Sequence, residues 1–309
     1  MSVFADPVTN YTAGYVTSLW LWSFAEPVLG LVWTIKMSAL TGTALCALAF
    51  HSVLKALEVD AEHRLFGTLL MLALPTVALN GAALAQADAF YTAFVLWSLA
   101  CVLRGRLIWA GIAFAVAISF KLQAIFFAPF LAGVMLRDPR AVIVSAIALV
   151  PTYLAVNTLY LAGGRPVTEV LMIYADQGGY YRDIWKGAAN LWWPVHATLT
   201  PEDLARHYDS FVRIGLALTV TVGLAILAAT RRTGPVTPRT RDALLKLATI
   251  SAAAVPFVLP KMHDRYFFMA EVMVLLLALT NRRYWPAVLL MQGSGALAYC
   301  GHEDILGFK

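Results

Sequence analysis

The sequence has 309 residues, of which 60% are hydrophobic and only 13% are charged. Soluble domains carry about a quarter charged residues, and here long blocks of Leu, Ala, Val and Phe replace the missing charge. Several blocks approach the roughly 20 apolar residues that a helix needs to cross a bilayer. The composition therefore predicts a polytopic membrane protein. A net charge of +5 is typical of a membrane protein whose cytoplasmic loops are rich in arginine. We therefore expect no nucleic-acid partner.

The N-terminal region, residues 1–33, precedes the first long apolar block. Residues 11–33 contain Trp20, Trp22 and Trp33 and are interrupted by Glu26 and Pro27. Aromatic residues in this number are typical of the membrane interface. We expect a juxtamembrane helix on the outer face rather than a span.

Ten apolar segments follow and predict about ten transmembrane helices. They cover residues 34–56, 65–82, 89–103, 107–120, 122–136, 141–162, 208–230, 243–259, 266–281 and 284–301. A large outer loop at 163–207 separates the sixth from the seventh. Within it, residues 182–185 and 190–194 predict interfacial helices and aromatic anchors. The expected fold is all-α, a single integral membrane domain over residues 1–309.

The distribution of Lys and Arg gives the orientation of these segments. If residues 1–33 lie outside, the cytoplasmic linkers are 55–64, 104–106, 137–140, 231–242 and 282–283. These linkers are rich in Lys and Arg, whereas the outer turn around 81–88 contains neither. The layout therefore satisfies the positive-inside rule.

With this orientation, unusual polar residues gather at the outer ends of the helices. They are Asp6, Asn10, Tyr11, Asn80, Gln86, Asp88, Tyr91, Lys121, Gln123, Lys261, His263, Asp264, Arg265 and Tyr266. A charge at membrane depth costs about 2.5–3.5 kcal/mol on insertion scales, so such residues tend to mark function. The cluster predicts a polar cavity in which cations bind an anionic group and carboxylates accept protons.

Simpler explanations exist for each part of the cluster. Residues 261–265 could form a solvated turn with an internal salt bridge, Lys121 could extend to the interface, and Asp88 could cap the helix that follows it. A divalent metal held by His263, Asp264 and Asp88 is conceivable, but the ligand spacing does not support it. No cofactor is expected.

Four motifs together resemble the GT-C superfamily of membrane glycosyltransferases. They are Gln86-Ala87-Asp88, Lys121-Leu122-Gln123, His263-Asp264-Arg265-Tyr266-Phe267 and the segment NYTAGYVTSLWLW at residues 10–22. The nearest branch is the bacterial relatives of the GPI-anchor mannosyltransferases. The resemblance covers most of residues 5–280.

This resemblance implies inverting transfer of a hexose, with mannose expected, from a polyprenyl-phosphate donor. The acceptor is unidentified and lies on the extracytoplasmic face of the cell membrane. The implied catalytic residues are Asp88, His263 and Asp6. The residues implied to bind the donor phosphate are Arg265, Lys121 and Lys261, and those implied to bind sugar or acceptor are Gln86, Gln123, Asp264, Tyr266 and Tyr11.

The chain departs from that branch at its start. Family members begin with a cytoplasmic N-terminus and a first span, followed by an outer loop that carries an aspartate taken as the catalytic base. Residues 1–33 resemble a remnant of that loop, so the role of Asp6 carries over weakly. We expect a further span upstream of Met1, or else a truncated and inactive relative.

Two other classes of function remain open. A transporter or flippase of a lipid-linked or anionic solute would show internal repeats and helices broken near the midplane. The sequence shows no convincing repeat, and its polar groups lie near one surface. A non-catalytic assembly subunit is the third interpretation.

Overall fold

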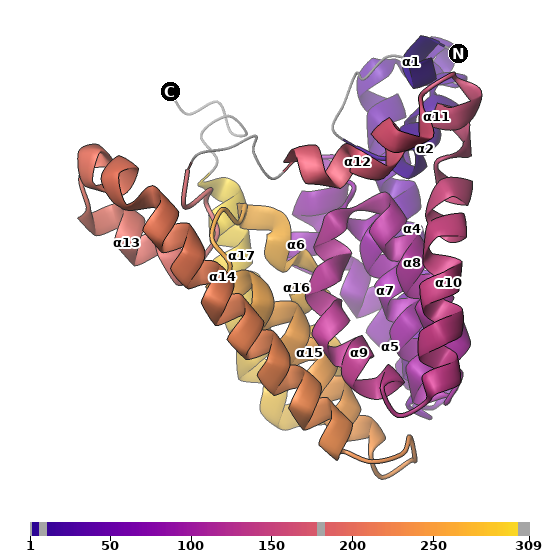
Figure 1. The fold of residues 1–309 in the computed structure, drawn as a ribbon. Coiled ribbons are helices and arrows are strands. Elements are labelled where there is room, and N and C mark those ends of the chain that lie inside the picture. The colour runs from indigo at the N-terminus through magenta and orange to yellow at the C-terminus, as the bar shows by residue number, and fades with distance from the viewer. Residues whose placement is uncertain (1, 6–10, 178–182, 302–309) are drawn as a thin grey trace. The chain divides into compact units, whose positions relative to one another are not determined.

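The computed structural model describes residues 2–5, 11–177 and 183–301, and these residues form helices joined by loops (Figure 1). Within these ranges the only β-type pairing consists of isolated bridges between His263 and residues Lys186 and Gly187. The all-α fold class is confirmed.

The helices group into two compact units. Unit 1 comprises Met1–Glu58, Asn80–Ile125 and Asp138–Tyr180, and unit 2 comprises Val59–Leu79, Phe126–Arg137 and Tyr181–Lys309. Each unit is described by itself. The single domain over residues 1–309 stays a prediction.

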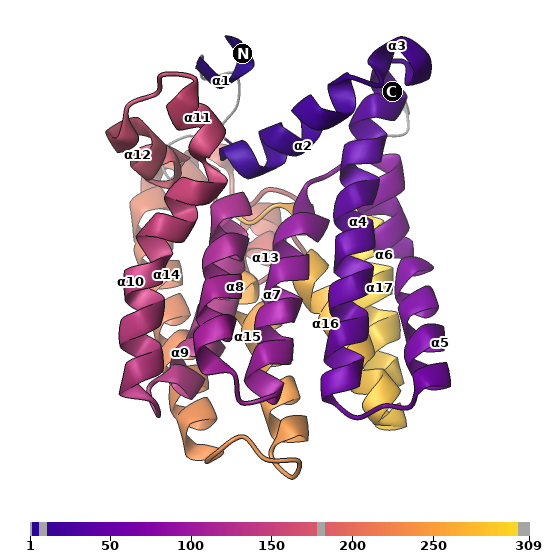
Figure 2. The ribbon, with the colours of Figure 1, turned by 90° about the vertical axis from the view of Figure 1, so that its right-hand side faces the viewer.

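Unit 1 is built around α7, which packs between α4 and α8, and α8 in turn packs against α10 (Figure 2). Its helices are α1 Ser2–Ala5, α2 Ala13–Ser23, α3 Glu26–Leu29, α4 Leu31–Ala56, α7 Asp88–Leu103, α8 Leu107–Phe120, α10 Pro139–Val156, α11 Thr158–Ala162 and α12 Val167–Gln177. Almost every residue of α7 is buried, as expected for a helix that is apolar on all sides. Gly42 of α4 allows close approach, because a Cβ atom there would lie 2.8 Å from the ring of Phe90.

The juxtamembrane region of unit 1 is helical but broken. α2 lies across the ends of α4 and α8 and contacts both helices (Figure 2). Helix α3 begins at Glu26 with Pro27 in its first turn, where proline costs no hydrogen bond. The predicted helix over residues 11–33 is therefore confirmed only in part: the chain breaks at Phe24–Ala25 and at Gly30, Glu26 and Pro27 lie inside α3, and α4 already begins at Leu31.

Unit 2 has α16 as its core helix, with α15 and α17 packed on it and α14 packed on α15 and α9 (Figure 1). Its elements are α5 Ala61–Leu72, α6 Pro75–Val77, α9 Ala128–Met135, α13 Trp192–Thr198, α14 Pro201–Arg232, α15 Arg241–Val258, the 3₁₀ turns Asp264–Phe267 and Arg282–Tyr284, α16 Phe268–Thr280 and α17 Trp285–Cys300. α16 is buried from Phe268 to Ala278. A π-helix, Ala78–Ala83, and a 3₁₀ helix, Leu122–Phe127, cross the boundaries between the units.

Several helices are apolar enough to cross a membrane, but ten spans are not confirmed. Among the described residues, α4, α10 and α14 have the required length and hydropathy. A fourth span results if Ala61–Leu72 and Pro75–Ala83, which are bent by 54°, count as one. The bend falls at Pro75, which cannot donate a backbone hydrogen bond. Each of the ten predicted segments overlaps a helix, and many of these helices are shorter than a bilayer needs.

The large outer loop differs from its prediction in part. Residues 192–198 form the short helix α13, which agrees with the expected interfacial helix near 190–194. Residues 183–190 are not helical, because their backbone pairs with the loop that follows α15. Residue 182 lies outside the described part of the chain.

Candidate active site

A buried ion pair joins the two ends of the α7–α8 hairpin in unit 1. Asp88 is the first residue of α7 and Lys121 follows the last residue of α8, so the hairpin brings them together. Lys121 Nζ lies 2.5 Å from Asp88 Oδ1, and the side chains are 7% and 0% exposed. Removing either charge would leave the other buried without compensation.

Three further side chains surround this pair. Asn80 Nδ2 donates a hydrogen bond of 3.0 Å to Asp88 Oδ2. The ring centroids of Tyr11 and Tyr91 lie 5.9 Å and 6.0 Å from Lys121 Nζ, within the range of cation–π attraction. Both carboxylate oxygens of Asp88 therefore accept bonds, and the ammonium group lies within about 6 Å of two aromatic ring centroids.

The simpler explanations for these two residues do not hold. The N-cap of α7 is Ala87, and Asp88 lies inside the helix. Lys121 is only 6% exposed and bonds a buried partner, so its side chain does not extend to the interface.

The turn before Asp88 is fixed by contacts from α2. Tyr15 donates a hydrogen bond of 3.2 Å to the carbonyl of Ala85, a residue with φ of 50°. Burial raises the pKa of Tyr15 to about 12, with smaller contributions from Tyr11 and Asp88, so its phenol stays protonated and can donate. The backbone N–H of Gln86 donates to the carbonyl of Asn80 at 2.8 Å. This turn therefore holds Asn80 next to Asp88.

The two predicted glutamines lie close to the pair in sequence. The side chain of Gln86 donates to the carbonyl of Leu84 at 3.3 Å and is half-buried. Gln123 follows Lys121 in the 3₁₀ helix, and its buried Oε1 atom has no hydrogen-bond partner among the described residues. That oxygen can accept a hydrogen bond from a ligand.

The second group of predicted residues lies in unit 2, in the loop that follows α15. Lys261 has φ of 65°, and its N–H donates to the carbonyl of Ile184 at 2.7 Å. The N–H of Asp264 donates to the carbonyl of Lys186 at 3.3 Å. The 183–187 segment therefore holds the loop as a short irregular ribbon.

The end of α15 is also bonded by the outer loop. Trp192 Nε1 donates to the carbonyl of Val258 at 2.8 Å, and the N–H of Leu191 donates to the carbonyl of Phe257 at 3.0 Å. Asn190 Nδ2 donates to the carbonyl of Leu259 at 3.3 Å. These carbonyls are the ones that a helix end leaves without intrahelical partners. Trp192, which was predicted to be a membrane anchor, thus supports the loop that follows α15 and carries Lys261 and His263, called the motif loop below.

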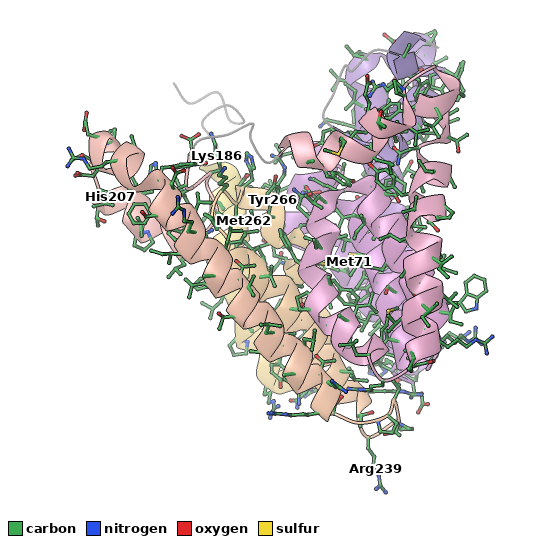
Figure 3. All side chains as sticks on the ribbon, in the orientation of Figure 1. Met71, Lys186, His207, Arg239, Met262 and Tyr266 are labelled. Atoms are coloured by element: carbon green, nitrogen blue, oxygen red, sulfur yellow. The ribbon has the colours of Figure 1, made fainter. Side chains whose placement is uncertain are left out.

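Side chains of this loop combine cationic, acidic and aromatic groups. The rings of His263 and Tyr266 are 5.2 Å apart, and Arg265 Cζ lies 6.0 Å from the ring of Tyr266. Lys261 Nζ lies 5.2 Å from the ring of Tyr208. Figure 3 shows Lys186, Met262 and Tyr266 at one end of unit 2 and Arg239 at the other.

Residues 261–265 are not a solvated turn. Asp264 is only 3% exposed, and its Oδ1 atom has no hydrogen-bond partner among the described residues. An ion pair also joins Lys186 to Asp183 in the segment that bonds this loop.

The predicted residues thus divide between the two units. Unit 1 holds Asp88, Lys121, Tyr11, Gln86 and Gln123, and unit 2 holds Lys261, His263, Asp264, Arg265 and Tyr266. Asp6 lies outside the described residues. No group of three or more His, Cys, Asp or Glu side chains in the described ranges is placed to hold a metal ion.

A buried polar cluster in unit 2 was missed by the sequence analysis. Gln292 Oε1 accepts bonds from the Thr76 backbone and hydroxyl at 3.2 Å and 2.9 Å, and its Nε2 donates to the carbonyl of Glu271 at 3.4 Å. Glu271 is 1% exposed. A single carboxylate in the apolar run of α16 was the available signal.

An all-α fold with several helices that are long and apolar enough to cross a bilayer is typical of a membrane protein. A family model described as Glycosyltransferase family 87 matches residues 10–260, most of the chain. No curated protein matches the chain. The protein therefore belongs to glycosyltransferase family 87. The matched range contains the Asp88–Lys121 pair and ends just before His263.

Proposed function

We propose that this protein transfers a hexose, mannose in the first instance, from a polyprenyl-phosphate donor to an acceptor at the extracytoplasmic face of the cell membrane. The observation that carries the proposal is the buried Asp88–Lys121 pair, in a chain that belongs to a glycosyltransferase family. Burial of an ion pair gains little stability over apolar packing, so its presence favours a functional role.

The chemistry of this transfer needs the groups found in unit 1. An acceptor hydroxyl attacks the anomeric carbon while the bond from that carbon to the phosphate oxygen breaks, and the phosphate leaves with the electron pair. A carboxylate must take the hydroxyl proton, and Asp88 is assigned this role. Lys121 compensates negative charge on the leaving phosphate.

The loop of unit 2 is assigned to the donor phosphate and sugar. Arg265 and Lys261 supply cationic donors for phosphate oxygens, since guanidinium and ammonium groups form strong charge-assisted hydrogen bonds. His263 contacts Tyr266 and is assigned to the phosphate or the sugar.

Each group lies at the opposite end of its unit from arginine-rich linkers between helices. In unit 1, Arg104 and Arg106 follow α7, whose 16 residues span about 24 Å from Asp88. In unit 2, α15 begins at Arg241 and ends before the motif, and Arg282 follows α16. If arginine-rich ends are cytoplasmic, both groups face the extracytoplasmic side.

A transporter of a lipid-linked solute is the second candidate. It is favoured by one observation, the 54° break between Ala61–Leu72 and Pro75–Ala83, because transporters use interrupted helices. The family match favours sugar transfer.

The direct test is a donor assay on the reconstituted protein. Vesicles receive either radiolabelled polyprenyl-phosphate mannose or a nucleotide-linked mannose, together with a membrane extract as the source of acceptor. The proposal predicts labelled product from the lipid-linked donor alone. Product from the nucleotide donor alone would overturn the proposed donor class, and movement of the intact donor without sugar transfer would support the transporter.

A further inference from the structure

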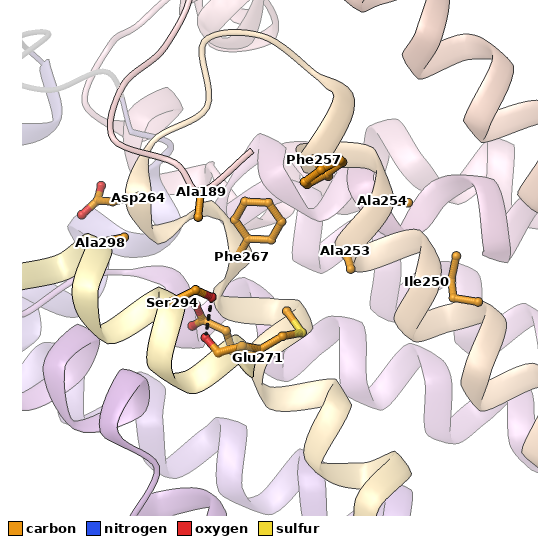
Figure 4. A pocket seen from close by; sticks show the side chains of 12 residues that line it. Ala189, Ile250, Ala253, Ala254, Phe257, Asp264, Phe267, Glu271, Ser294 and Ala298 are labelled. Atoms are coloured by element: carbon orange, nitrogen blue, oxygen red, sulfur yellow. Dashed lines mark hydrogen bonds between the residues drawn. The ribbon is translucent and has the colours of Figure 1, made fainter. Parts of the chain in front are cut away.

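Two buried side-chain amides, Gln292 and Asn157, lie outside the groups assigned to the reaction. Gln292 belongs to unit 2 and donates a hydrogen bond to the carbonyl of Glu271, a residue that lines a groove of about 390 Å³ along α15, α16 and α17 (Figure 4). Small residues of α15 and α17 line the same groove, namely Ala253, Ala254, Gly295 and Ala298. Because Gln292 also bonds Thr76, it joins α17 to α6 and α16. It serves below as a structural reference for Asn157.

Asn157 joins α10 and α11 of unit 1 to the first turn of α2. It lies between α10 and α11, where it caps both helices, and it is fully buried. Its Oδ1 atom accepts a hydrogen bond of 2.8 Å from the backbone N–H of Ala13, and its Nδ2 atom donates to the carbonyl of Tyr153 at 2.8 Å. The first N–H groups of a helix have no partner within that helix. Asn157 therefore fixes the point at which α2 begins.

Two further hydrogen bonds hold the residues just before Ala13. The hydroxyl of Tyr160, a buried residue of α11, donates to the carbonyl of Tyr11 at 2.9 Å. Thr12 Oγ1 donates to the carbonyl of Phe120 at 3.1 Å. Phe120 directly precedes Lys121, so residues 11–13 are bonded both to α11 and to the end of α8.

The segment held in this way contacts the surroundings of both members of the Asp88–Lys121 pair. The ring centroid of Tyr11 lies 5.9 Å from Lys121 Nζ and 5.2 Å from the ring centroid of Tyr15. Tyr15 donates to the carbonyl of Ala85 in the turn before Asp88. Helix α2 packs against α4, α8 and α11 (Figure 2). A displacement of its first turn would therefore move Tyr11 away from Lys121.

From these contacts we infer that Asn157 and Tyr160 are positioning residues for sugar transfer. They hold Tyr11 beside Lys121, and the cation–π attraction of that ring keeps the ammonium group where it compensates the leaving phosphate. Both residues act through Tyr11 rather than on the substrates. This inference rests on the proposed function, since it concerns the same reaction.

Tyr160→Phe and Tyr153→Phe form a matched pair of variants. Each removes one hydroxyl and keeps the ring, and both residues belong to the same buried apolar cluster. The hydroxyl of Tyr153 donates to the carbonyl of Val170 at 2.8 Å, away from residues 11–13. Since a displacement of about 1 Å can cost about 100-fold in rate, kcat of Tyr160→Phe should fall about tenfold or more, with the donor KM near that of the wild type. Tyr153→Phe should keep the wild-type kcat, and an equal loss in both variants would overturn the inference.

A double-mutant cycle with Tyr11→Leu tests whether Tyr160 acts through the ring of Tyr11. Tyr160 bonds the backbone carbonyl of residue 11, which Tyr11→Leu keeps. Once the ring is absent, Tyr160→Phe should lower kcat by less than about twofold more, because both substitutions remove the same contact with Lys121. Effects that multiply as independent factors would contradict the inference.

Asn157→Ala and Gln292→Ala compare the two buried amides. Both variants lose buried hydrogen bonds, so thermal unfolding in detergent should occur at a lower temperature in each. Only Asn157→Ala should also lower kcat about tenfold or more, because it alone displaces the first turn of α2. Parallel losses of kcat would show that activity follows stability and would overturn the assignment of Asn157. If Asn157→Ala does not insert, the comparison of Tyr160→Phe with Tyr153→Phe decides.

A measurement without substrate keeps this inference distinct from the proposed function. The tyrosines are replaced by 3-fluorotyrosine, and the ¹⁹F resonance of Tyr11 is assigned by its absence in Tyr11→Phe. This resonance should shift in Tyr160→Phe and Asn157→Ala and stay unchanged in Tyr153→Phe and Gln292→Ala. An unchanged Tyr11 resonance in Tyr160→Phe would overturn the inference whatever the rates. A wild-type protein that transfers no sugar from any polyprenyl phosphate would defeat the proposed function, while the ¹⁹F spectra would still decide whether Asn157 and Tyr160 position Tyr11.

Discussion

At the scale of single residues, the account depends on Asp88 and Lys121. Each is buried, and each is compensated by the other and by Asn80, Tyr11 or Tyr91. Stability and chemistry make different demands on this pair. An uncharged pair of similar size would satisfy packing, but it could neither take a proton nor compensate a phosphate charge.

This difference gives a prediction from a double-mutant cycle. Lys121→Met leaves the Asp88 carboxylate buried and unpaired, so the free energy of unfolding should fall by about 3–5 kcal/mol. The double variant Asp88→Asn/Lys121→Gln should recover most of that stability and remain inactive. Thermal unfolding in detergent and the transfer assay measure the two effects. Recovery of activity together with stability would show that the pair is purely structural.

A second residue-scale prediction concerns a pair that is fully exposed. Asp60 caps α5 and accepts a hydrogen bond from the ring of His63. This bond raises the pKa of His63 above its ordinary 6.5 and lowers that of Asp60 below 3.8. The contribution of His63 to stability is present below pH 6.5 and is lost as the pH rises through the raised value. The contribution of Asp60 is present above pH 3.8 and is lost as the pH falls through the lowered value. The pair therefore stabilises most between these limits.

The measurement is an NMR titration of ¹³C-labelled histidine, with His63→Gln used for assignment. Asp60→Asn should return the pKa of His63 towards 6.5. An unchanged titration in Asp60→Asn would mean that the ring does not bond the carboxylate in solution.

At the scale of elements, the motif loop depends on a segment about 70 residues earlier in the chain. Trp192, Leu191 and Asn190 bond carbonyls at the end of α15, and Ile184 and Lys186 bond the loop itself. The position of His263 and Arg265 is therefore set by the outer loop. Substitutions of the residues that donate these hydrogen bonds should therefore lower the transfer rate, because they displace His263 and Arg265.

Trp192→Phe tests the support, because it keeps an aromatic ring and removes the indole N–H. Loss of one buried hydrogen bond should cost about 1–3 kcal/mol, with kcat lowered more than donor KM is raised. Limited proteolysis should also cut the 260–266 loop faster. Trp193→Phe, at a neighbouring residue that is 54% exposed, is the control. If both variants behaved alike, the hydrogen bond to Val258 would have no role in positioning the loop.

At the scale of the whole molecule, we expect the orientation in the membrane to follow from the positions of the arginine-rich linkers. In unit 2, Lys186 and Arg239 lie at opposite ends (Figure 3). In a background without cysteines, made by replacing Cys46, Cys101 and Cys300 with Ala, a membrane-impermeant maleimide added outside cells should label Lys186→Cys. It should label Arg239→Cys only after the cells are broken open. The reverse pattern would place the motif loop in the cytoplasm.

Much of the fold was predictable because apolar blocks and arginine-rich linkers are local features of the sequence. The number of spans was not, since Pro75 bends one predicted segment and several others form helices too short to cross alone. Asp88 and Lys121 could be found as charges beside apolar runs, but their pairing required the hairpin of α7 and α8.

Other parts of the candidate site had no local signal. The role of Trp192 depends on a carbonyl 66 residues away in the sequence. The aromatic residues around Trp192 in the sequence therefore indicated only a membrane anchor. Glu271 did have a signal, as a lone carboxylate in an apolar run, and the groove beside it depends on small residues from two other helical segments. No spacing within one segment could predict that groove.

The central claim is that the buried groups of this family 87 protein carry out sugar transfer from a polyprenyl phosphate. The most direct measurement compares initial rates of transfer from polyprenyl-phosphate mannose for Asp88→Asn, His263→Ala and the exposed control Asp60→Asn, at matched amounts of inserted protein. General base catalysis contributes about 10²–10⁴-fold to the rate, so the transfer rate of Asp88→Asn should be at least 100-fold below that of the wild type. His263→Ala should be similarly impaired. Asp60→Asn should keep the wild-type rate. Wild-type rates in Asp88→Asn and His263→Ala would contradict the account.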